Sequence, residues 1–190
     1  MANGFLSKKE LNQKEKSFPL EVCFCNSCKL VQLTHVVSPE LMFKNYVYVS
    51  STTETFKRHF AKMAEEISNS FNLSGNSLVV DIGSNDGILL KGFQKFGVQA
   101  VGVEPAANVA RIAEQNGVET INDFFGEGAV NLIIKRKGHA DVVTAANVFA
   151  HVNDIGEFAG CVKTLLKAEG IFVIEVQYFA DTIEKMTFDN

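Results

Sequence analysis

Short apolar runs alternate with segments of helical periodicity along most of the chain. Five apolar runs, each with the length and composition of a strand buried on both faces, cover residues 78–82, 100–103, 118–121, 140–146 and 170–176. Helical spacing of apolar positions fills the gaps between them, over residues 88–93, 106–115, 127–137 and 154–166. Strands that alternate with crossover helices form parallel sheets. We therefore predict an α/β fold with a doubly wound, mostly parallel sheet.

The N-terminal part follows a different pattern. Short apolar stretches on either side of residues 23–28 predict a hairpin, and Ser38 before Pro39 predicts the start of a helix. Residues 45–51 alternate aromatic and polar side chains, which favours an amphipathic edge strand. Thr52 and Thr53 precede an amphipathic helix that ends near a cluster of turn residues. We divide the chain into a hairpin region over residues 1–50, a connecting helix over residues 51–76 and an α/β domain over residues 77–190.

A glycine turn follows the first buried strand of the α/β domain. Gly83 and Gly87 have Asn85 between them, so the turn lacks the Gly-x-Gly-x-x-Gly pattern that cradles a pyrophosphate. Asp81 and Asp86 would also repel a pyrophosphate. The same carboxylates suit a cationic nucleoside without phosphate, and S-adenosylmethionine (SAM) carries an ammonium, a sulfonium and a ribose. The alternative is a buried turn in which Asp86 caps the next helix.

Further polar residues follow the ends of the other predicted strands. Glu104 lies 21 residues after Gly83 and before Pro105, where an acidic side chain commonly accepts hydrogen bonds from ribose hydroxyls. Asp123 and Phe124 follow the third strand and are candidates to hold adenine, with a core role for the phenylalanine as the alternative. Asn147 and His151 follow the fourth strand, and Glu175 lies at the end of the fifth. Because ligands of doubly wound sheets lie outside the carboxyl ends of the strands, we predict a ligand site at this edge.

Composition narrows the class of partner. The net charge of −4 and the pI near 5.6 give no support for a nucleic-acid or membrane partner, and no apolar run reaches the roughly 18 residues that cross a bilayer. The N-terminus lacks the apolar core of a signal peptide, which favours a cytoplasmic protein. Cys25 and Cys28 form a Cys-x-x-Cys pair, which is half of a tetrahedral zinc site. Reduced structural cysteines in a small hairpin are an equally good interpretation.

Four stretches together resemble the SAM-dependent sugar C-methyltransferases, which act on nucleotide-linked keto-deoxysugars. They are Pro19-Leu20-Glu21-Val22 with the segment from Cys25 to Leu33, Asp81-Ile82-Gly83-Ser84-Asn85-Asp86-Gly87, Gly102-Val103-Glu104-Pro105 and Asn147-Val148-Phe149-Ala150-His151-Val152. The resemblance implies a zinc-binding N-terminal domain, a SAM-binding Rossmann-like domain and a further C-terminal domain. It also implies a chain cut at both ends, because a family cysteine pair would precede it and a Tyr-His-Glu-His motif would follow a segment like Thr187-Phe188-Asp189.

The resemblance also implies a chemical role for the site. Methylation of a carbon beside a ketone needs a base that forms an enolate, and alignment of that enolate with the sulfonium methyl. His151 is the expected base or enolate stabiliser, and Tyr46 (or Tyr48, if the register differs) is expected to donate a hydrogen bond to the oxyanion. The expected cofactor contacts are Asp81, Gly83, Asn85, Asp86, Gly87, Glu104, Pro105, Asp123, Phe124 and Asn147. Three alternatives stay open: a helix-capping or core role for His151, an NAD-dependent oxidoreductase on the same fold, and a catalytically incomplete SAM-binding fragment.

Overall fold

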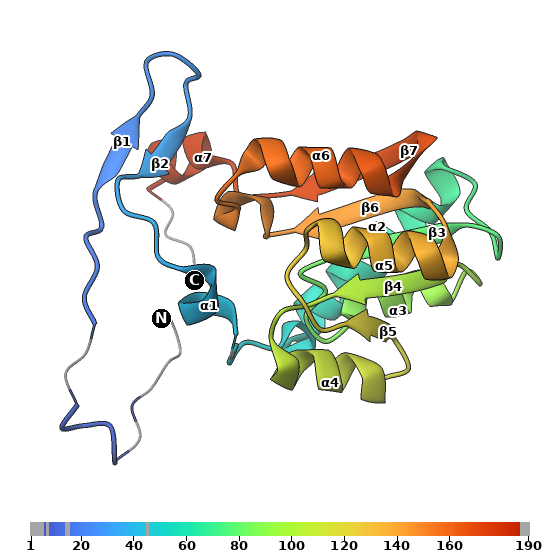
Figure 1. Ribbon diagram of the computed structural model, residues 1–190, viewed down its shortest axis with the longest axis horizontal. Coiled ribbons are helices and arrows are strands. Elements are labelled where there is room, and N and C mark those ends of the chain that lie inside the picture. The colour runs from blue at the N-terminus through green and yellow to red at the C-terminus, as the bar shows by residue number, and fades with distance from the viewer. Residues whose placement is uncertain (1–5, 7, 14–15, 45, 187–190) are drawn as a thin grey trace.

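The computed structural model describes residues 6, 8–13, 16–44 and 46–186, and Figure 1 shows their arrangement. At its centre is a five-stranded sheet with the order β5-β4-β3-β6-β7, in which every pair of neighbours is parallel. The strands are β3 (Leu78–Ile82), β4 (Gln99–Val103), β5 (Glu119–Ile121), β6 (Ala140–Ala146) and β7 (Leu166–Glu175). From β3 the chain adds β4 and β5 at one edge of the sheet, and it then crosses back to add β6 and β7 on the other side of β3. The doubly wound parallel sheet is therefore confirmed.

Helices cover both faces of this sheet (Figure 1). They are α2 (Glu54–Ser70), α3 (Ile88–Gln94), α4 (Ala107–Gln115), α5 (Glu127–Lys137) and α6 (Ile155–Leu165). Side chains of α2, α3 and α4 share one apolar cluster with Val79, whereas those of α5 and α6 share a second cluster with Val80 and Ile82. Successive residues of β3 thus point to opposite faces, which is why its sequence is apolar without interruption up to Asp81.

The helix α2 packs closely on α3. Thr53 caps α2 by accepting a hydrogen bond from the backbone N–H of Phe56. Its buried face includes Phe60 and Ala64. Close approach depends on Gly92 of α3, because a Cβ there would lie 2.6 Å from the Cβ of Ala64. The helix therefore contributes to the core of the α/β unit, while the division of the chain at residue 76 stays a prediction.

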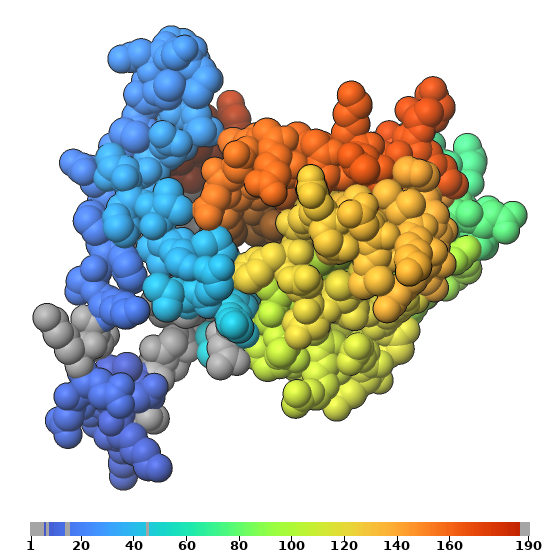
Figure 2. Space-filling view, viewed as in Figure 1, coloured from blue at the N-terminus to red at the C-terminus, as the bar shows by residue number. Residues whose placement is uncertain are grey.

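Residues 16–44 form an arm beside the compact body of the molecule (Figure 2). β1 (Val22–Phe24) and β2 (Val31–Leu33) pair antiparallel, which gives the predicted hairpin. α1 (Pro39–Phe43) begins after Ser38, as predicted. The predicted edge strand over residues 45–51 is wrong: residues 46–49 have no strand structure, and Ser50–Thr52 form the 3-10 helix η1. Asn45 and the segment 187–189 lie outside the described residues.

The strand β7 begins earlier than its apolar run predicts. It starts at Leu166, directly after α6, instead of at residue 170. Leu166 pairs with Ala140, the register then shifts, and pairing resumes between Ile171 and Val142. The four residues between, 167–170, form a bulge at the amino end of the strand. Lys167 and Glu169 in this bulge interrupt the run of apolar residues, so the apolar pattern does not reveal the amino end of the strand.

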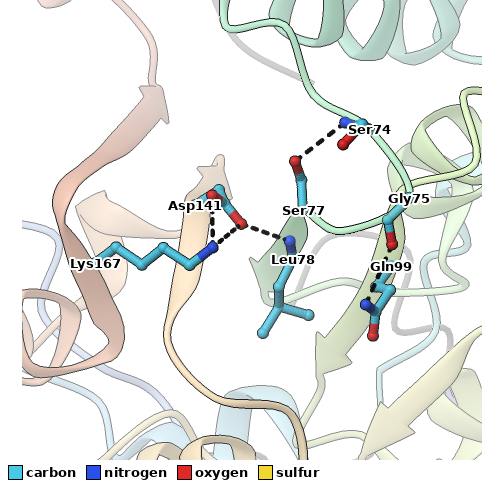
Figure 3. A network of polar contacts seen from close by, with 7 residues as sticks. All are labelled: Ser74, Gly75, Ser77, Leu78, Gln99, Asp141 and Lys167. Atoms are coloured by element: carbon cyan, nitrogen blue, oxygen red, sulfur yellow. Dashed lines mark hydrogen bonds and ion pairs between the residues drawn. The ribbon is translucent and has the colours of Figure 1, made fainter.

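A polar network ties together the amino ends of three strands, at the edge of the sheet away from the predicted site (Figure 3). Lys167 donates through Nζ to both carboxylate oxygens of Asp141 at 2.8 Å. The Oδ2 atom of Asp141 also accepts from the backbone N–H of Leu78 at 2.8 Å. β6, β3 and β7 therefore share one carboxylate, and this part of the molecule has a structural role.

The remaining elements are short. They are the 3-10 helix η2 (Phe149–His151) and the helix α7 (Phe179–Glu184). Among the described residues, no helix combines the length and the apolar character that a bilayer crossing requires.

Candidate functional site

The glycine turn lies between β3 and α3, at the carboxyl-end edge of the sheet. Gly83 and Gly87 have φ angles of 66° and 79°, in the left-handed region where a side chain is strained. A Cβ on Gly83 would overlap a methyl group of Val148, and one on Gly87 would lie 2.9 Å from Val118. Space as well as backbone conformation therefore requires glycine at both positions.

Two buried carboxylates stand side by side behind this turn. Asp81 accepts a hydrogen bond of 2.6 Å from the hydroxyl of Thr144, and Glu104 accepts from the backbone N–H groups of Asn85 (2.9 Å) and Ala106 (2.8 Å). Burial raises the pKa of Asp81 to about 7, with Thr144 opposing the shift and the charge of Glu104 adding to it. Burial also raises the pKa of Glu104, against the effect of its two backbone donors. This end of the sheet is thus strongly electronegative when both groups are ionised.

Asp86 supplies a third buried carboxylate. Its Oδ2 atom accepts from the backbone N–H of Ser51 at 3.2 Å, whereas Oδ1 is buried with no hydrogen-bond partner among the described residues. The nearby hydroxyl of Ser84 is likewise buried without a partner in that part of the chain. α3 has no side-chain cap, so the interpretation of Asp86 as a helix cap is wrong. An unpaired buried carboxylate oxygen is costly, which makes this atom a candidate ligand contact.

Residues 46–52, which we call the strap, lie across the glycine turn. The carboxamide of Asn85 accepts from the backbone N–H of Ser50 at 2.9 Å and donates to the backbone oxygen of Tyr48 at 3.0 Å. The structure thus places Asn85, an expected cofactor contact, against the strap. Burial and the charge of Glu104 raise the pKa of Tyr46, and burial and the charge of Asp86 raise that of Tyr48. The charges of the buried carboxylates therefore act on both phenols.

An aromatic contact connects the strap to η2. The ring centroid of Phe43 lies 5.9 Å from that of Tyr46 and 5.4 Å from that of His151. Desolvation lowers the pKa of His151 below its ordinary value, so the imidazole is neutral at neutral pH. The two expected catalytic side chains, which are far apart in the sequence, thus contact the same phenylalanine.

The other expected contacts have different surroundings. The carboxylate of Asp123 accepts from the backbone N–H of Phe124 at 2.8 Å, and the Phe124 side chain is 37% exposed. Its neighbour Phe125 instead packs on Phe158, with ring centroids 5.2 Å apart. The backbone oxygen of Pro105 accepts from the side chain of Asn122 at 3.1 Å. Phe124 is therefore available at the edge of the sheet, while Phe125 belongs to the core.

Asn147 begins the turn that leads to His151. Its φ angle of 57° is left-handed, and its backbone N–H donates to the backbone oxygen of Glu175 at 2.7 Å. The side chains of these two residues are also in contact at 3.4 Å. Glu175 is paired in turn with Nε2 of His59 at 2.6 Å. Sequence patterns did not single out His59, because a lone histidine on an amphipathic helix gives no signal.

The Cys-x-x-Cys pair lies in the turn of the β1–β2 hairpin. Cys25 and Cys28 are free thiols, and the backbone N–H groups of Cys28 and Ser27 hold the pKa of Cys25 below its ordinary value. Two cysteine side chains at this spacing fit one half of a tetrahedral zinc site. Within the part of the chain that the structure describes, no group of three or more metal-ligating side chains is present.

Comparison with known protein families tests the expectation that the chain is a methyltransferase. Residues 54–189 match the family model described as "Methyltransferase domain". The chain belongs to this methyltransferase family. Residues 1–43 of the methyltransferase match a second model, described as "Putative zinc binding domain". The resemblance found in the sequence motifs is confirmed by these two matches.

Curated relatives agree with this family. C-methyltransferase NovU from Streptomyces niveus is 35% identical over 189 residues, which make up 100% of this chain and 45% of the relative. A ubiquinone biosynthesis O-methyltransferase from Rhodopseudomonas palustris (strain HaA2) is 30% identical over 131 residues, or 68% of this chain and 50% of the relative. This methyltransferase chain thus spans about half the length of the curated relatives that it matches.

Solved structures share the fold. The PH0226 protein from Pyrococcus horikoshii OT3 superposes with a TM-score of 0.55 at 14% identity, over 78% of this chain and 63% of that one. An S-adenosylmethionine-dependent methyltransferase from Clostridium acetobutylicum ATCC 824 gives a TM-score of 0.53 at 16% identity, over 70% and 58% of the two chains. The Rossmann-like fold of SAM-dependent methyltransferases is therefore confirmed, while the individual site residues stay predictions.

Proposed function

We propose that the chain binds SAM at the carboxyl-end edge of its sheet and serves C-methylation of a nucleotide-linked keto-deoxysugar through an enolate. The observation that supports this most strongly is the buried Asp86 carboxylate, whose Oδ1 atom has no hydrogen-bond partner among the described residues. A cationic ammonium would satisfy that oxygen, whereas a pyrophosphate would be repelled by Asp86, Asp81 and Glu104 together. The NAD-dependent alternative is disfavoured on the same ground.

The residues present fit this cofactor. Glu104 ends β4 and would accept hydrogen bonds from ribose hydroxyls with the lone pairs that its two backbone donors leave free. Asp123 and Phe124, at the end of β5, would hold the adenine. When bound, SAM supplies an electrophilic methyl group on its sulfonium.

The chemistry on the substrate falls to His151 and Tyr46. A neutral imidazole can remove a proton from the carbon beside the ketone, and the lowered pKa of His151 keeps it neutral. A phenol with a raised pKa stays protonated and can donate a hydrogen bond to the enolate oxygen. Substrate bound against both groups would be deprotonated by one and aligned by the other, although the two residues are far apart in the sequence.

Replacing Glu104 with glutamine tests the cofactor site. We expect the dissociation constant for SAM to rise about 10-fold, because a hydrogen bond to a charged group contributes roughly 1.5–3 kcal/mol. Isothermal titration with SAM and with NADH measures both affinities, and Glu114→Gln, on the exposed face of α4, is the matched control. Tighter binding of NADH than of SAM would contradict the proposed cofactor.

Replacing His151 with alanine tests the base. Methyl transfer to a keto-deoxysugar nucleotide should slow by roughly 10²-fold, while the affinity for SAM stays unchanged. His139→Ala is the control, because His139 is at the opposite edge of the sheet and contacts the backbone oxygen of Thr164. Exchange of the proton beside the ketone for deuterium, followed by NMR, reports the base step separately from methyl transfer.

A second candidate function rests on the length of the chain. The methyltransferase chain spans 45% of NovU. SAM binding without deuterium exchange or methyl transfer would favour a catalytically incomplete SAM-binding fragment. Turnover by the chain of 190 residues would exclude it.

A further inference from the structure

Asn108 makes an unusual pair of contacts with the strap. It lies in the first turn of α4, with an exposed side chain, 62 residues after Tyr46. Its carboxamide accepts from the backbone N–H of Tyr46 at 3.3 Å and donates to the backbone oxygen of the same residue at 2.6 Å. A carboxamide carries a donor and an acceptor side by side, so it takes the place that a neighbouring strand would have.

The helix itself gives no reason for asparagine at this position. Ala106 is the N-cap of α4, and no side chain caps the helix. Val109 and Ala110 make the buried contacts that hold α4 on the sheet. Asparagine is a weak helix former in a helix interior. The contacts with Tyr46 are therefore the structural role that distinguishes Asn108 from alanine.

Asn85 also holds the strap, but its side chain takes part in the glycine turn as well. Asn85 bonds to the backbone of Tyr48 and Ser50, but its Oδ1 atom also accepts from the backbone N–H of Asp86 within the glycine turn. A change at Asn85 would disturb the cofactor site and the strap together. The described side-chain hydrogen bonds of Asn108 go only to the strap. A substitution of Asn108 therefore tests the position of the strap without changing a residue of the glycine turn.

We infer that Asn108 is a positioning residue, which fixes the backbone of Tyr46 so that its ring stays in contact with Phe43, whose ring also contacts that of His151. This inference rests on the proposed function only for the role of Tyr46 in methyl transfer. The contact itself can be tested without any substrate. Loss of both hydrogen bonds should lower the population of the docked strap by about 10-fold.

The tyrosine phenols provide the test. The chain has three tyrosines and no tryptophan, and Tyr178 is 72% exposed, so near-ultraviolet absorbance during an alkaline titration reports Tyr46 and Tyr48 against a solvent-exposed reference. Tyr46→Phe and Tyr48→Phe assign the two raised transitions. In Asn108→Ala we expect the pKa of Tyr46 to fall toward its ordinary value, because the phenol becomes more exposed to solvent and moves away from the charge of Glu104 and from Tyr48. Far-ultraviolet circular dichroism at each pH verifies that the fold persists.

Two further variants separate positioning from general destabilisation. Asn131→Ala, at an exposed position of α5, should leave the Tyr46 transition unchanged. Asn108→Gln keeps the carboxamide and should restore part of the raised pKa. An unchanged Tyr46 transition in a folded Asn108→Ala variant would overturn the inference, whatever the protein catalyses.

Methyl transfer supplies the second measurement. Asn108→Ala should lower kcat about 10-fold with little change in the KM for SAM, and Asn108→Ala combined with Tyr46→Phe should be no slower than Tyr46→Phe alone. Additive losses would contradict positioning through Tyr46. A shifted Tyr46 transition in a chain without methyl transfer would support the role of Asn108 and count against the proposed function.

Discussion

Raising the pH from 3.8 to about 7 is expected to lower the free energy of unfolding by on the order of 4 kcal/mol through Asp81 alone. Burial raises the pKa of this carboxyl, so the folded chain holds its proton more tightly than the unfolded chain does. The stabilisation is therefore complete below the unfolded pKa of 3.8, is lost as the pH rises, and is gone above about 7. Urea unfolding followed by circular dichroism at several pH values measures this slope.

The matched variant is Asp81→Asn, which keeps the size of the side chain and an oxygen acceptor for Thr144. The difference in unfolding free energy between the two proteins should change across this pH range, whatever the other titrating groups contribute. Thr144→Val removes the hydrogen bond that favours the ionised form, so it should extend the loss to higher pH. Parallel pH profiles for the original protein and Asp81→Asn would contradict the prediction.

Replacing Gly83 with alanine is expected to lower the free energy of unfolding by about 2–5 kcal/mol. The left-handed φ of 66° accounts for about 1–2 kcal/mol of this loss, and overlap of the new methyl group with Val148 accounts for about 1–3 kcal/mol. Chemical denaturation at one fixed pH is the appropriate measurement, because the variant is also expected to disturb the ligand site.

Gly97 provides the control for backbone strain. Its φ is 74°, but a Cβ there would have no neighbour within 4 Å, so Gly97→Ala should show the conformational cost alone. Combining Gly83→Ala with Val148→Ala should recover part of the steric loss and make the two changes non-additive. Equal losses for Gly83→Ala and Gly97→Ala would show that Val148 moves aside freely.

Much of the fold could be predicted because its strands are buried on both faces. Such strands are short uninterrupted apolar runs, and β3 and β6 were predicted with the bounds that they have. The gathering of Asp81, Asp86 and Glu104 followed from topology, since parallel strands bring their carboxyl ends to one edge. The amino end of β7 was missed because it begins with a polar bulge.

The strap could not be predicted from local pattern. Its alternation of aromatic and polar side chains is the same as that of an edge strand, but its backbone bonds to the side chains of Asn85 and Asn108 instead of to a neighbouring strand. These partners lie 37 and 62 residues from Tyr48 and Tyr46 respectively. Asn85 stood out only as an expected cofactor contact, and Asn108 did not stand out at all. Likewise, no local signal indicates that Phe43 contacts both Tyr46 and His151.

The docked strap lowers the measured affinity for any ligand that uses the same atoms of the glycine turn. The amide of Asn85 and one oxygen of Asp86 are already occupied by the backbone of Tyr48, Ser50 and Ser51. Any ligand that needs those same atoms can bind only the fraction of molecules in which they are released, so its measured dissociation constant equals the intrinsic one divided by that fraction. If release occurs in about one molecule in ten, binding is about tenfold weaker than the pocket itself would allow.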